Sequence, residues 1–333
     1  MAFVAISIDL CGSTRVKQRI VELARGDHAA RERMYGAYKR LLYNIERTFY
    51  LLILQEPTID FERLTLIKNI GDELWYAYRI DDAFSEDEAA SIQNLLTTLL
   101  HLISSDRTLT LAGDGRQSRS NAGVRFDLPI KVYVDLVDHC EELNRGRYEH
   151  LKDVVAAARG LTSTVIDLDD DFFETCERLN LSVPEGPRGR RRAYAREDYI
   201  GLEIDRFFRL TKQCFPRLLT VGRNLFDFIG YSLTPVAPDY EHLDLKLIKP
   251  GDESIGLGVA NEPVFAIRSA IASAEMKGIS DDYAVYYLFD LPSLGDHFAA
   301  PSPIIDGMMD ETRGFLAEKG FFAVVDRTRA AAL

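Results

Sequence analysis

Cysteine, histidine and long apolar runs are all scarce in this chain of 333 residues. The four cysteines form no CxxC pair and the six histidines form no HExxH motif, so neither a disulfide framework nor a zinc enzyme is indicated. Uninterrupted apolar runs are short, with six residues at Phe49–Leu54 and seven at Tyr283–Phe289, whereas a membrane-spanning helix needs about 20. No basic segment precedes Asp9, so the N-terminus is not typical of a signal peptide. We therefore expect a reduced, cytoplasmic protein without a membrane segment.

Positive charge is also in deficit. The chain has 40 Lys and Arg against 52 Asp and Glu, and its formal net charge is −12. Nonspecific binding of nucleic acid requires a positive surface that neutralises phosphates, so we expect no nucleic-acid partner. The net charge does not exclude a small phosphorylated ligand, because a local binding site can be positive on an acidic protein. Apolar residues make up 47% of the chain, which indicates a folded protein and not a disordered one.

Strand and helix patterns alternate along the chain. Apolar, β-branched residues predict a first strand at Phe3–Ile8, and a long helical stretch follows with an interruption at Gly26-Asp27, where Asp27 is a suitable N-cap. The Asn69–Asp72 segment separates two short apolar runs and predicts a β-hairpin. We expect further helices at 86–104, 141–159 and 200–214, a loop at 105–124, and strands at 126–137, 218–221, 264–267 and 321–325. Strands interleaved with long helices indicate a layered α/β or α+β fold.

Two aspartates occupy comparable positions at the ends of strands. Asp9 follows the first apolar strand, and Asp72 lies in the hairpin turn. If these strands are neighbours, both carboxylates converge on one edge of the sheet, where a cation relieves their repulsion. Oxygen ligands without nearby His or Cys favour Mg²⁺ or Mn²⁺. The Gly12-Ser13-Thr14 turn opens the next helix, whose N-terminal amides suit a triphosphate. The alternative for each aspartate taken alone is a turn-capping role.

Two more segments carry charged residues in informative places. Lys68 stands near the end of an otherwise apolar strand, four residues before Asp72, and either reaches solvent or faces a ligand. Asp205 and Arg209 share one face of a predicted helix, because they are four residues apart. They form either a surface ion pair or a site where the guanidinium faces a phosphate.

Taken together, these segments resemble the class III nucleotidyl cyclase family. In that family an aspartate ends the first strand before a turn with Gly and Ser or Thr, as in Asp9-Leu10-Cys11-Gly12-Ser13-Thr14. A K-x-x-G-D hairpin carries the second metal motif, which Lys68–Asp72 matches. The third motif has an Asp, a Gly three residues later, and then an Asn and an Arg separated by four. The matching positions here are Asp198, Gly201, Asp205 and Arg209.

The resemblance implies a site with two Mn²⁺ or Mg²⁺ ions. Asp9 and Asp72 would hold both ions, and the main-chain carbonyl of Leu10 would be a further ligand. One ion would lower the pKa of the ribose 3′-hydroxyl, and the other would bind the triphosphate beside Gly12-Ser13-Thr14. The 3′-oxygen would then attack the α-phosphorus, and diphosphate would leave.

The resemblance also assigns roles to the other motif residues. Arg209 would stabilise the charge that develops on the α-phosphate, and Asp205 stands at the catalytic position of the family's Asn. Lys68 and Asp198 would read the base. Since the family takes the metal ligands from one subunit and the arginine from the other, a head-to-tail homodimer with two composite sites is implied.

The implied fold is α+β, with a ferredoxin-like, palm-type sheet and flanking helices as in class III cyclases. Residues 1–268 would form the catalytic domain, and residues 269–333 a C-terminal extension packed on it.

Two departures from the ordinary family pattern narrow the resemblance. Asp205 replaces the usual Asn, and the stretch between the fourth predicted strand and Asp198 is longer than in ordinary members. A free-standing cyclase with these features resembles the pyrimidine cyclases of bacterial Pycsar anti-phage systems, whose cyclic UMP or cyclic CMP activates a separate effector protein. UTP is the favoured substrate by that resemblance. The hydrogen-bonding groups of Lys68 and Asp198 suit uracil, cytosine or adenine equally.

Several alternatives stay open at this point. The chain could be a cytidylate or adenylate cyclase, or a catalytically inactive nucleotide-binding sensor. A palm-type polymerase or diguanylate cyclase also uses two carboxylates, but no GGDEF-like residues occur at the hairpin. The five arginines within Arg188–Arg196 indicate a surface loop or a phosphate or partner contact, and Lys246 and Lys249 are weaker candidates for a triphosphate contact.

Overall fold

The computed structural model describes residues 2–80, 86–105, 108–111, 124–142, 198–230, 233–237, 240–243, 264–276, 279–290, 294 and 309–321. Four features expected from the sequence lie wholly or almost wholly outside these residues: the Arg188–Arg196 cluster, the Lys246 and Lys249 pair, the helix at 141–159 and the strand at 321–325. Within the described part of the chain, helices and strands alternate, and the predicted α+β fold is confirmed.

The helices of the described residues are α1 (Ser13–Ala24), α2 (His28–Gln55), α3 (Glu86–Ser104), α6 (Leu202–Leu210), α7 (Arg223–Ile229) and α9 (Asp310–Glu318), with short 3-10 turns at Phe61–Arg63, Thr211–Gln213 and Ser273–Glu275. The strands are β1 (Ala2–Leu10), β2 (Leu64–Ile70), β3 (Glu73–Ile80), β4 (Thr108–Leu111), β5 (Val124–Asp127), β6 (Ile130–Val137), β7 (Glu141–Glu142), β8 (Tyr199–Ile200), β9 (Leu219–Gly222), β10 (Leu233–Ala237), β11 (Tyr240–Leu243), β12 (Val264–Ile271) and β13 (Tyr283–Phe289). None of the described helices is long and apolar enough to cross a membrane.

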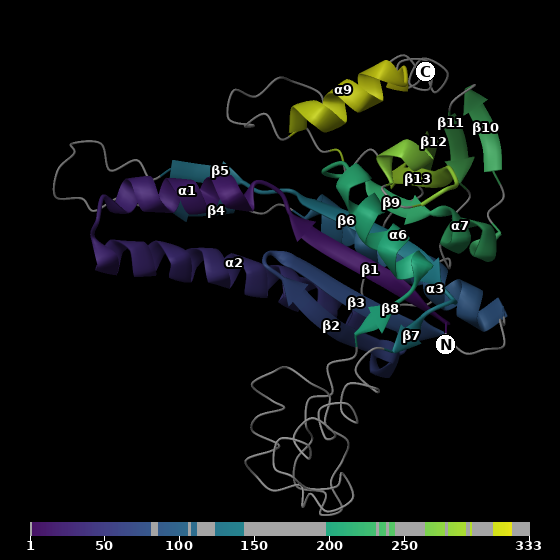
Figure 1. The fold of residues 1–333 in the computed structure, drawn as a ribbon, viewed down its shortest axis with the longest axis horizontal. Coiled ribbons are helices and arrows are strands. Elements are labelled where there is room, and N and C mark those ends of the chain that lie inside the picture. The colour runs from purple at the N-terminus through teal and green to yellow at the C-terminus, as the bar shows by residue number, and fades with distance from the viewer. Residues whose placement is uncertain are drawn as a thin grey trace, which may run out of the picture.

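One nine-stranded sheet organises the molecule, in the order β10-β11-β12-β13-β9-β6-β1-β3-β2 (Figure 1). Strand β1 lies between β6 and β3 and is antiparallel to both. The pairing sets Asp9 directly opposite Lys131 on one side and Glu73 on the other. The end of β1 is therefore where charged residues of three adjacent strands meet.

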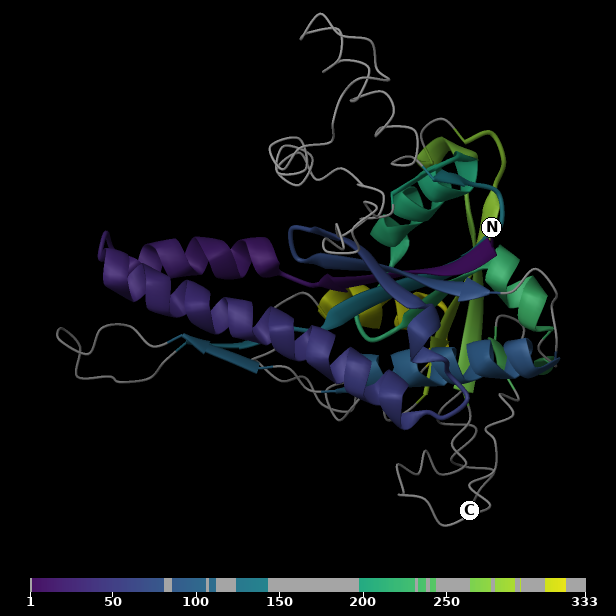
Figure 2. The same cartoon turned by 90° about the horizontal axis from the view of Figure 1, so that it is seen from below.

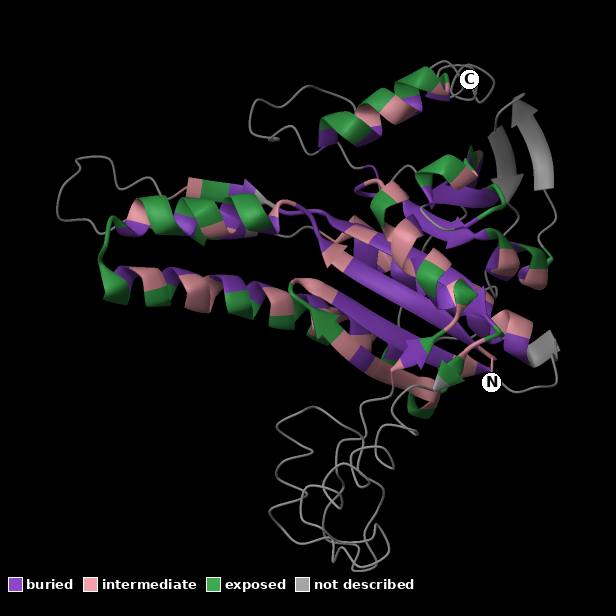
Figure 3. Ribbon diagram, viewed as in Figure 1, coloured by how far each residue is buried: buried purple, intermediate pink, exposed green. Residues whose placement is uncertain are grey.

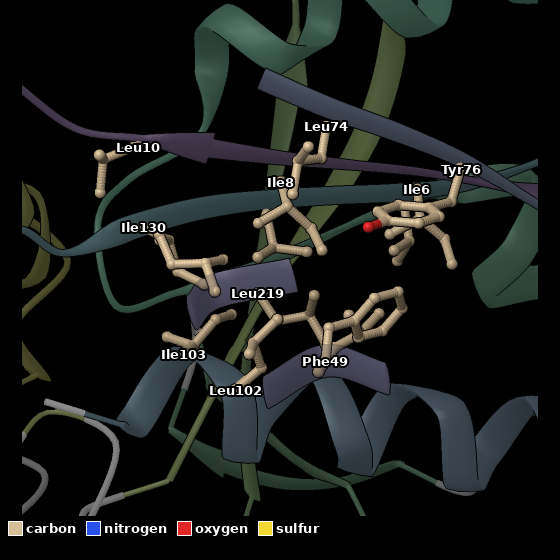
Figure 4. Packing of buried hydrophobic residues seen from close by; sticks show 14 of the residues in the cluster. Ile6, Ile8, Leu10, Phe49, Leu74, Tyr76, Leu102, Ile103, Ile130 and Leu219 are labelled. Carbon is tan, nitrogen blue, oxygen red and sulfur yellow. The ribbon is translucent and has the colours of Figure 1, made fainter. Parts of the chain in front are cut away.

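Alternate side chains of β1 enter two separate cores. Ile6 and Ile8 join the larger core under α2 and α3, whereas Phe3 and Ala5 join the core under α6. Figure 2 shows α2 and α3 on one face of the sheet and α6 on the other. The central strands are accordingly buried along most of their length (Figure 3), and Phe49 packs beneath Tyr76 within the larger core (Figure 4). Burial on both faces explains why β1 has an almost continuously apolar sequence.

The long helical pair forms as the sequence predicts. The Asp27 side chain accepts a hydrogen bond from the Ala30 amide and caps the start of α2. The apolar residues of α2 repeat at helical spacing and are buried, from Ala30 to Ile53. On the same helix Leu51 and Leu54 are 46% and 60% exposed, so only one side of the Phe49–Leu54 run enters the core.

Several expected boundaries were wrong. The helix expected at 200–214 begins two residues later as α6, because Gly201 has a φ of 151° and closes β8. The strand expected at 126–137 is split into β5 and β6 by Leu128 and Pro129, since proline cannot donate to a sheet ladder. Part of the loop expected at 105–124 is strand β4, which pairs with β5. Glu141 and Glu142 form strand β7 and not the start of a helix.

The division of the chain at residue 268 stays a prediction. Strand β12 runs from Val264 to Ile271 across that position, and β13 pairs with β12 within the same sheet. Further on, the Thr312 hydroxyl of α9 donates to the Pro216 carbonyl at 2.9 Å, and Phe315 stacks on Phe215 at 4.4 Å between ring centroids.

Candidate functional site

A cavity of about 360 Å³ lies where β1 ends and α1 begins. It brings together all six residues that the sequence assigns to metal ions and triphosphate, and it adds others. The lining residues are Asp9, Leu10, Cys11, Gly12, Ser13, Thr14, Asp72, Lys131, Pro216 and Glu311.

The turn between β1 and α1 gives the cavity its backbone donors. Gly12 precedes α1 with a φ of 73°, a left-handed conformation that glycine adopts without strain. The Cys11 amide donates to the Pro129 carbonyl at 3.0 Å, which fixes the start of the turn against β6. Gly12, the N-cap residue of α1, has no side chain that could accept hydrogen bonds from the first amides of this helix. They point to a region where an anion is favourable.

Asp9 carries an unfavourable charge in this cavity. Burial raises the pKa of Asp9 to about 6, and the negative charges of Asp72 and Glu73 act in the same direction. Lys131, its partner across the strands, only partly offsets them. Glu73 is itself engaged, since it accepts a hydrogen bond from the Ser7 hydroxyl at 2.5 Å. A cation between Asp9 and Asp72 would remove the repulsion.

Asp72 enters the cavity from the turn that follows β2. Gly71 makes the turn with a φ of 71°, and Asp72 is the next residue before β3. The Lys17 ammonium of α1 donates to Asp72 Oδ1 at 3.2 Å. The hairpin turn is thus attached to the helix that begins at the cavity.

Lys131 and Glu311 are cavity residues that the sequence did not single out. Lys131 is a lysine between Ile130 and Val132, in the same kind of apolar strand that drew attention to Lys68, and this signal could have identified it. Glu311 comes from α9, and its Oε2 lies 3.9 Å from the Lys131 Nζ. No local pattern in α9 indicates that it faces the cavity.

Lys68 and Asp198 form a second pair, apart from the lining of the cavity. The Lys68 Nζ donates to Asp198 Oδ1 at 2.6 Å, and both side chains are about one-third exposed or less. The ammonium also lies over the rings of Trp75 and Phe208, at 4.8 and 5.5 Å from their centroids. The two residues expected to read a base are therefore adjacent, on a platform of aromatic rings.

The α6 residues Asp205 and Arg209 do not line the cavity. Asp205 is exposed, and the structure records no ion pair between the two among the described residues. The Arg209 Nε is buried without a hydrogen-bond partner within the described part of the chain. Gly201, which precedes α6, has no room for a side chain, because a Cβ there would lie 2.9 Å from the His139 carbonyl oxygen.

The donor set of the cavity suits a hard divalent ion. It offers the carboxylates of Asp9 and Asp72 and the backbone oxygens near Leu10, while the third carboxylate of the lining, Glu311, lies beside Lys131. No group of three or more His, Cys, Asp or Glu residues suited to a metal occurs among the described residues. Such a set leaves coordination positions for water or for oxygens of a substrate, as Mg²⁺ and Mn²⁺ prefer. The uncompensated charge of Asp9 is consistent with this fit.

No protein-family model and no curated protein matches the chain. Solved structures similar to it include the non-canonical dimeric guanylyl cyclase domain of the RhoGC fusion protein from the aquatic fungus Blastocladiella emersonii, with 8% identity, a TM-score of 0.39, and 87% of this chain and 96% of that chain covered. The adenylyl cyclase CyaB from P. aeruginosa has 12% identity, a TM-score of 0.36, and coverage of 87% and 94%. Adenylate cyclases from Trypanosoma brucei in their monomeric state have 9% identity, a TM-score of 0.39, and coverage of 86% and 89%.

Proposed function

We propose that the protein is a nucleotidyl cyclase that converts a nucleoside triphosphate into its 3′,5′-cyclic monophosphate and diphosphate. The observation that carries the proposal is the cavity in which Asp9 and Asp72 lie beside the N-terminus of α1. Two carboxylates for metal ions beside the N-terminus of a helix for phosphates form the combination that such a reaction needs.

The cavity supplies the ligands for metal ions and for phosphate in the proposed reaction. Asp9, Asp72 and the Leu10 carbonyl would hold two Mn²⁺ or Mg²⁺ ions, which when bound acidify the ribose 3′-hydroxyl and neutralise the triphosphate. The Gly12-Ser13-Thr14 turn and Lys131 would bind the phosphate oxygens. The bond from the 3′-oxygen to the α-phosphorus forms, the bond from that phosphorus to the bridging oxygen of the diphosphate breaks, and the hydroxyl proton leaves to solvent.

Arg209 would complete the site from a second copy of the chain. It lies on α6, away from the cavity lining, and its Nε has no partner among the residues that the structure describes. The guanidinium that stabilises the developing charge on the α-phosphate would therefore come from a neighbouring subunit, in a head-to-tail homodimer. Asp205 would then contact the ribose or steady that guanidinium.

UTP is the substrate that we favour, and cyclic UMP would act on a separate effector protein in antiviral defence. The Lys68–Asp198 pair presents a donor next to an acceptor, which complements the adjacent N–H and carbonyl of uracil. The same pair suits cytosine or adenine, so cyclic CMP and cyclic AMP are the alternative products. A catalytically inactive nucleotide sensor is the alternative of a different class.

The test is incubation of the purified protein with ATP, GTP, CTP and UTP separately, each with Mn²⁺ and with Mg²⁺, followed by mass spectrometry. Cyclic UMP that disappears in Asp72→Asn is the expected result. If the product is cyclic CMP or cyclic AMP, the proposed mechanism stands and the substrate is CTP or ATP. Nucleotide binding without any cyclic product would favour the sensor.

A further inference from the structure

The ammonium of Lys17 contacts Asp72, one of the two carboxylates that the proposed function assigns to metal ions. Lys17 belongs to α1, one helical turn after Ser13, and its ammonium is 3.2 Å from Asp72 Oδ1. The two residues are 55 positions apart in the chain, so this is not a local ion pair within one helix. The contact therefore depends on how α1 and the β2–β3 turn are brought together.

The local charges explain why the ammonium is held there. Asp72 and Asp9 repel each other, and Lys131 lies opposite Asp9 in the strand register. Lys17 supplies the matching positive charge for Asp72, and the Tyr38 ring lies 5.6 Å from its Nζ. Asp72 and Asp9 thus each have one lysine near them, Lys17 and Lys131 respectively.

A divalent ion and an ammonium cannot use the same carboxylate oxygen without cost. An ion held by Asp9 and Asp72 needs lone pairs of the Asp72 carboxylate, and the positive charges of the ion and of Lys17 repel each other at such distances. The Lys17 side chain is 37% exposed, so its flexible stem can withdraw the ammonium into solvent.

We propose that Lys17 is a tethered counterion that competes with the divalent metal ion for Asp72. Lys17 neutralises Asp72 while the metal is absent, and metal binding displaces the ammonium. Lys17 thereby lowers the affinity of the nucleotide-free protein for the ion. This inference rests on the metal-binding part of the proposed function and on no assumption about the nucleotide.

The experiment measures Mn²⁺ binding to the full-length, nucleotide-free protein by electron paramagnetic resonance and by calorimetry. Lys17→Met should bind Mn²⁺ at least about fivefold more tightly than the natural protein, because the competing charge is gone. Lys39→Met is the matched control, since it removes an exposed lysine of α2 and should leave the affinity unchanged. The gain should disappear in the Lys17→Met/Asp72→Asn double variant.

Unchanged or weaker Mn²⁺ binding by Lys17→Met would overturn the proposal, because Lys17 would then support the metal site or have no part in it. An absence of Mn²⁺ binding by both proteins at millimolar concentration would overturn it as well. Lys17→Gln provides the same comparison if the methionine variant fails to fold. The cyclase proposal can fail independently. Tighter Mn²⁺ binding by Lys17→Met, with no turnover of any nucleotide by the natural protein, would support the role of Lys17 as a counterion and contradict the proposed cyclase reaction.

Discussion

Lys68 and Asp198 are 130 positions apart in the chain, and their side chains meet at 2.6 Å. The contact joins β2 to the residue just before β8, across the aromatic rings of Trp75 and Phe208. Both side chains keep about a quarter to a third of their surface exposed. The exposed part of the pair can contact a ligand that binds beside it, as the proposed reading of the base requires.

Lys68→Met should therefore change the choice of base. We expect the ratio of kcat/KM values among the four nucleoside triphosphates to shift, while the free energy of unfolding falls by about 1–3 kcal/mol, because the partly buried Asp198 loses its charged partner. Lys131→Met is the control, because a lysine at the phosphate end should affect all four substrates to the same extent. A parallel loss for every base in Lys68→Met would contradict the role of the pair.

Asp9→Asn and Asp72→Asn should each abolish turnover and leave the fold intact. Loss of a group that only orients a metal ligand already costs about 10–100-fold, so loss of a ligand itself should lower kcat/KM by at least about 100-fold. Asp9→Asn should not lower the melting temperature of the metal-free protein, because it removes one of two repelling carboxylates. Circular dichroism and product analysis check both parts. Near-normal activity in either variant would exclude the assigned metal role.

Glu311→Gln should strengthen substrate binding. The carboxylate faces the cavity at 3.9 Å from the Lys131 ammonium and is 68% exposed, so it competes with phosphate oxygens for the same cation. We expect KM for the nucleotide to fall several-fold with little change in kcat. Glu318→Gln removes the same charge from the other end of α9 and should behave like the natural protein. Equal KM values in the two variants would show that Glu311 does not act on the site.

The sequence predicted the parts of the site that lie close together in the chain. The Asp9–Thr14 turn and the Lys68–Asp72 hairpin are short segments whose local chemistry fixes their conformation. The structure brings the turn and Asp72 of the hairpin to one cavity, with Lys68 outside its lining. Lys17 and Glu311 were missed for different reasons. Lys17 looks like any exposed lysine of an amphipathic helix, and Glu311 reaches the cavity only because Phe315 and Thr312 anchor α9 on distant residues. Tertiary packing of this kind leaves no periodic signal in the sequence.

Asp135 should make the stability of the protein depend on pH. Burial raises its pKa to about 6 although two tyrosine hydroxyls and two backbone amides donate to it. The folded chain therefore keeps a proton on Asp135 at pH values where the unfolded chain, with a pKa of 3.8 for this group, has lost it. The stabilising contribution is fully present below pH 3.8 and is lost as the pH rises through about 6.

The matched variant is Asp135→Asn, because asparagine can accept from the amides and has no titrating proton. Between pH 5 and pH 7.5, the natural protein should lose about 1.5 kcal/mol of unfolding free energy relative to this variant. Urea denaturation of both proteins at the two pH values measures the difference. If both lose the same amount, Asp135 titrates alike in the folded and unfolded chains, and the buried carboxylate is stabilised as an anion by its four donors.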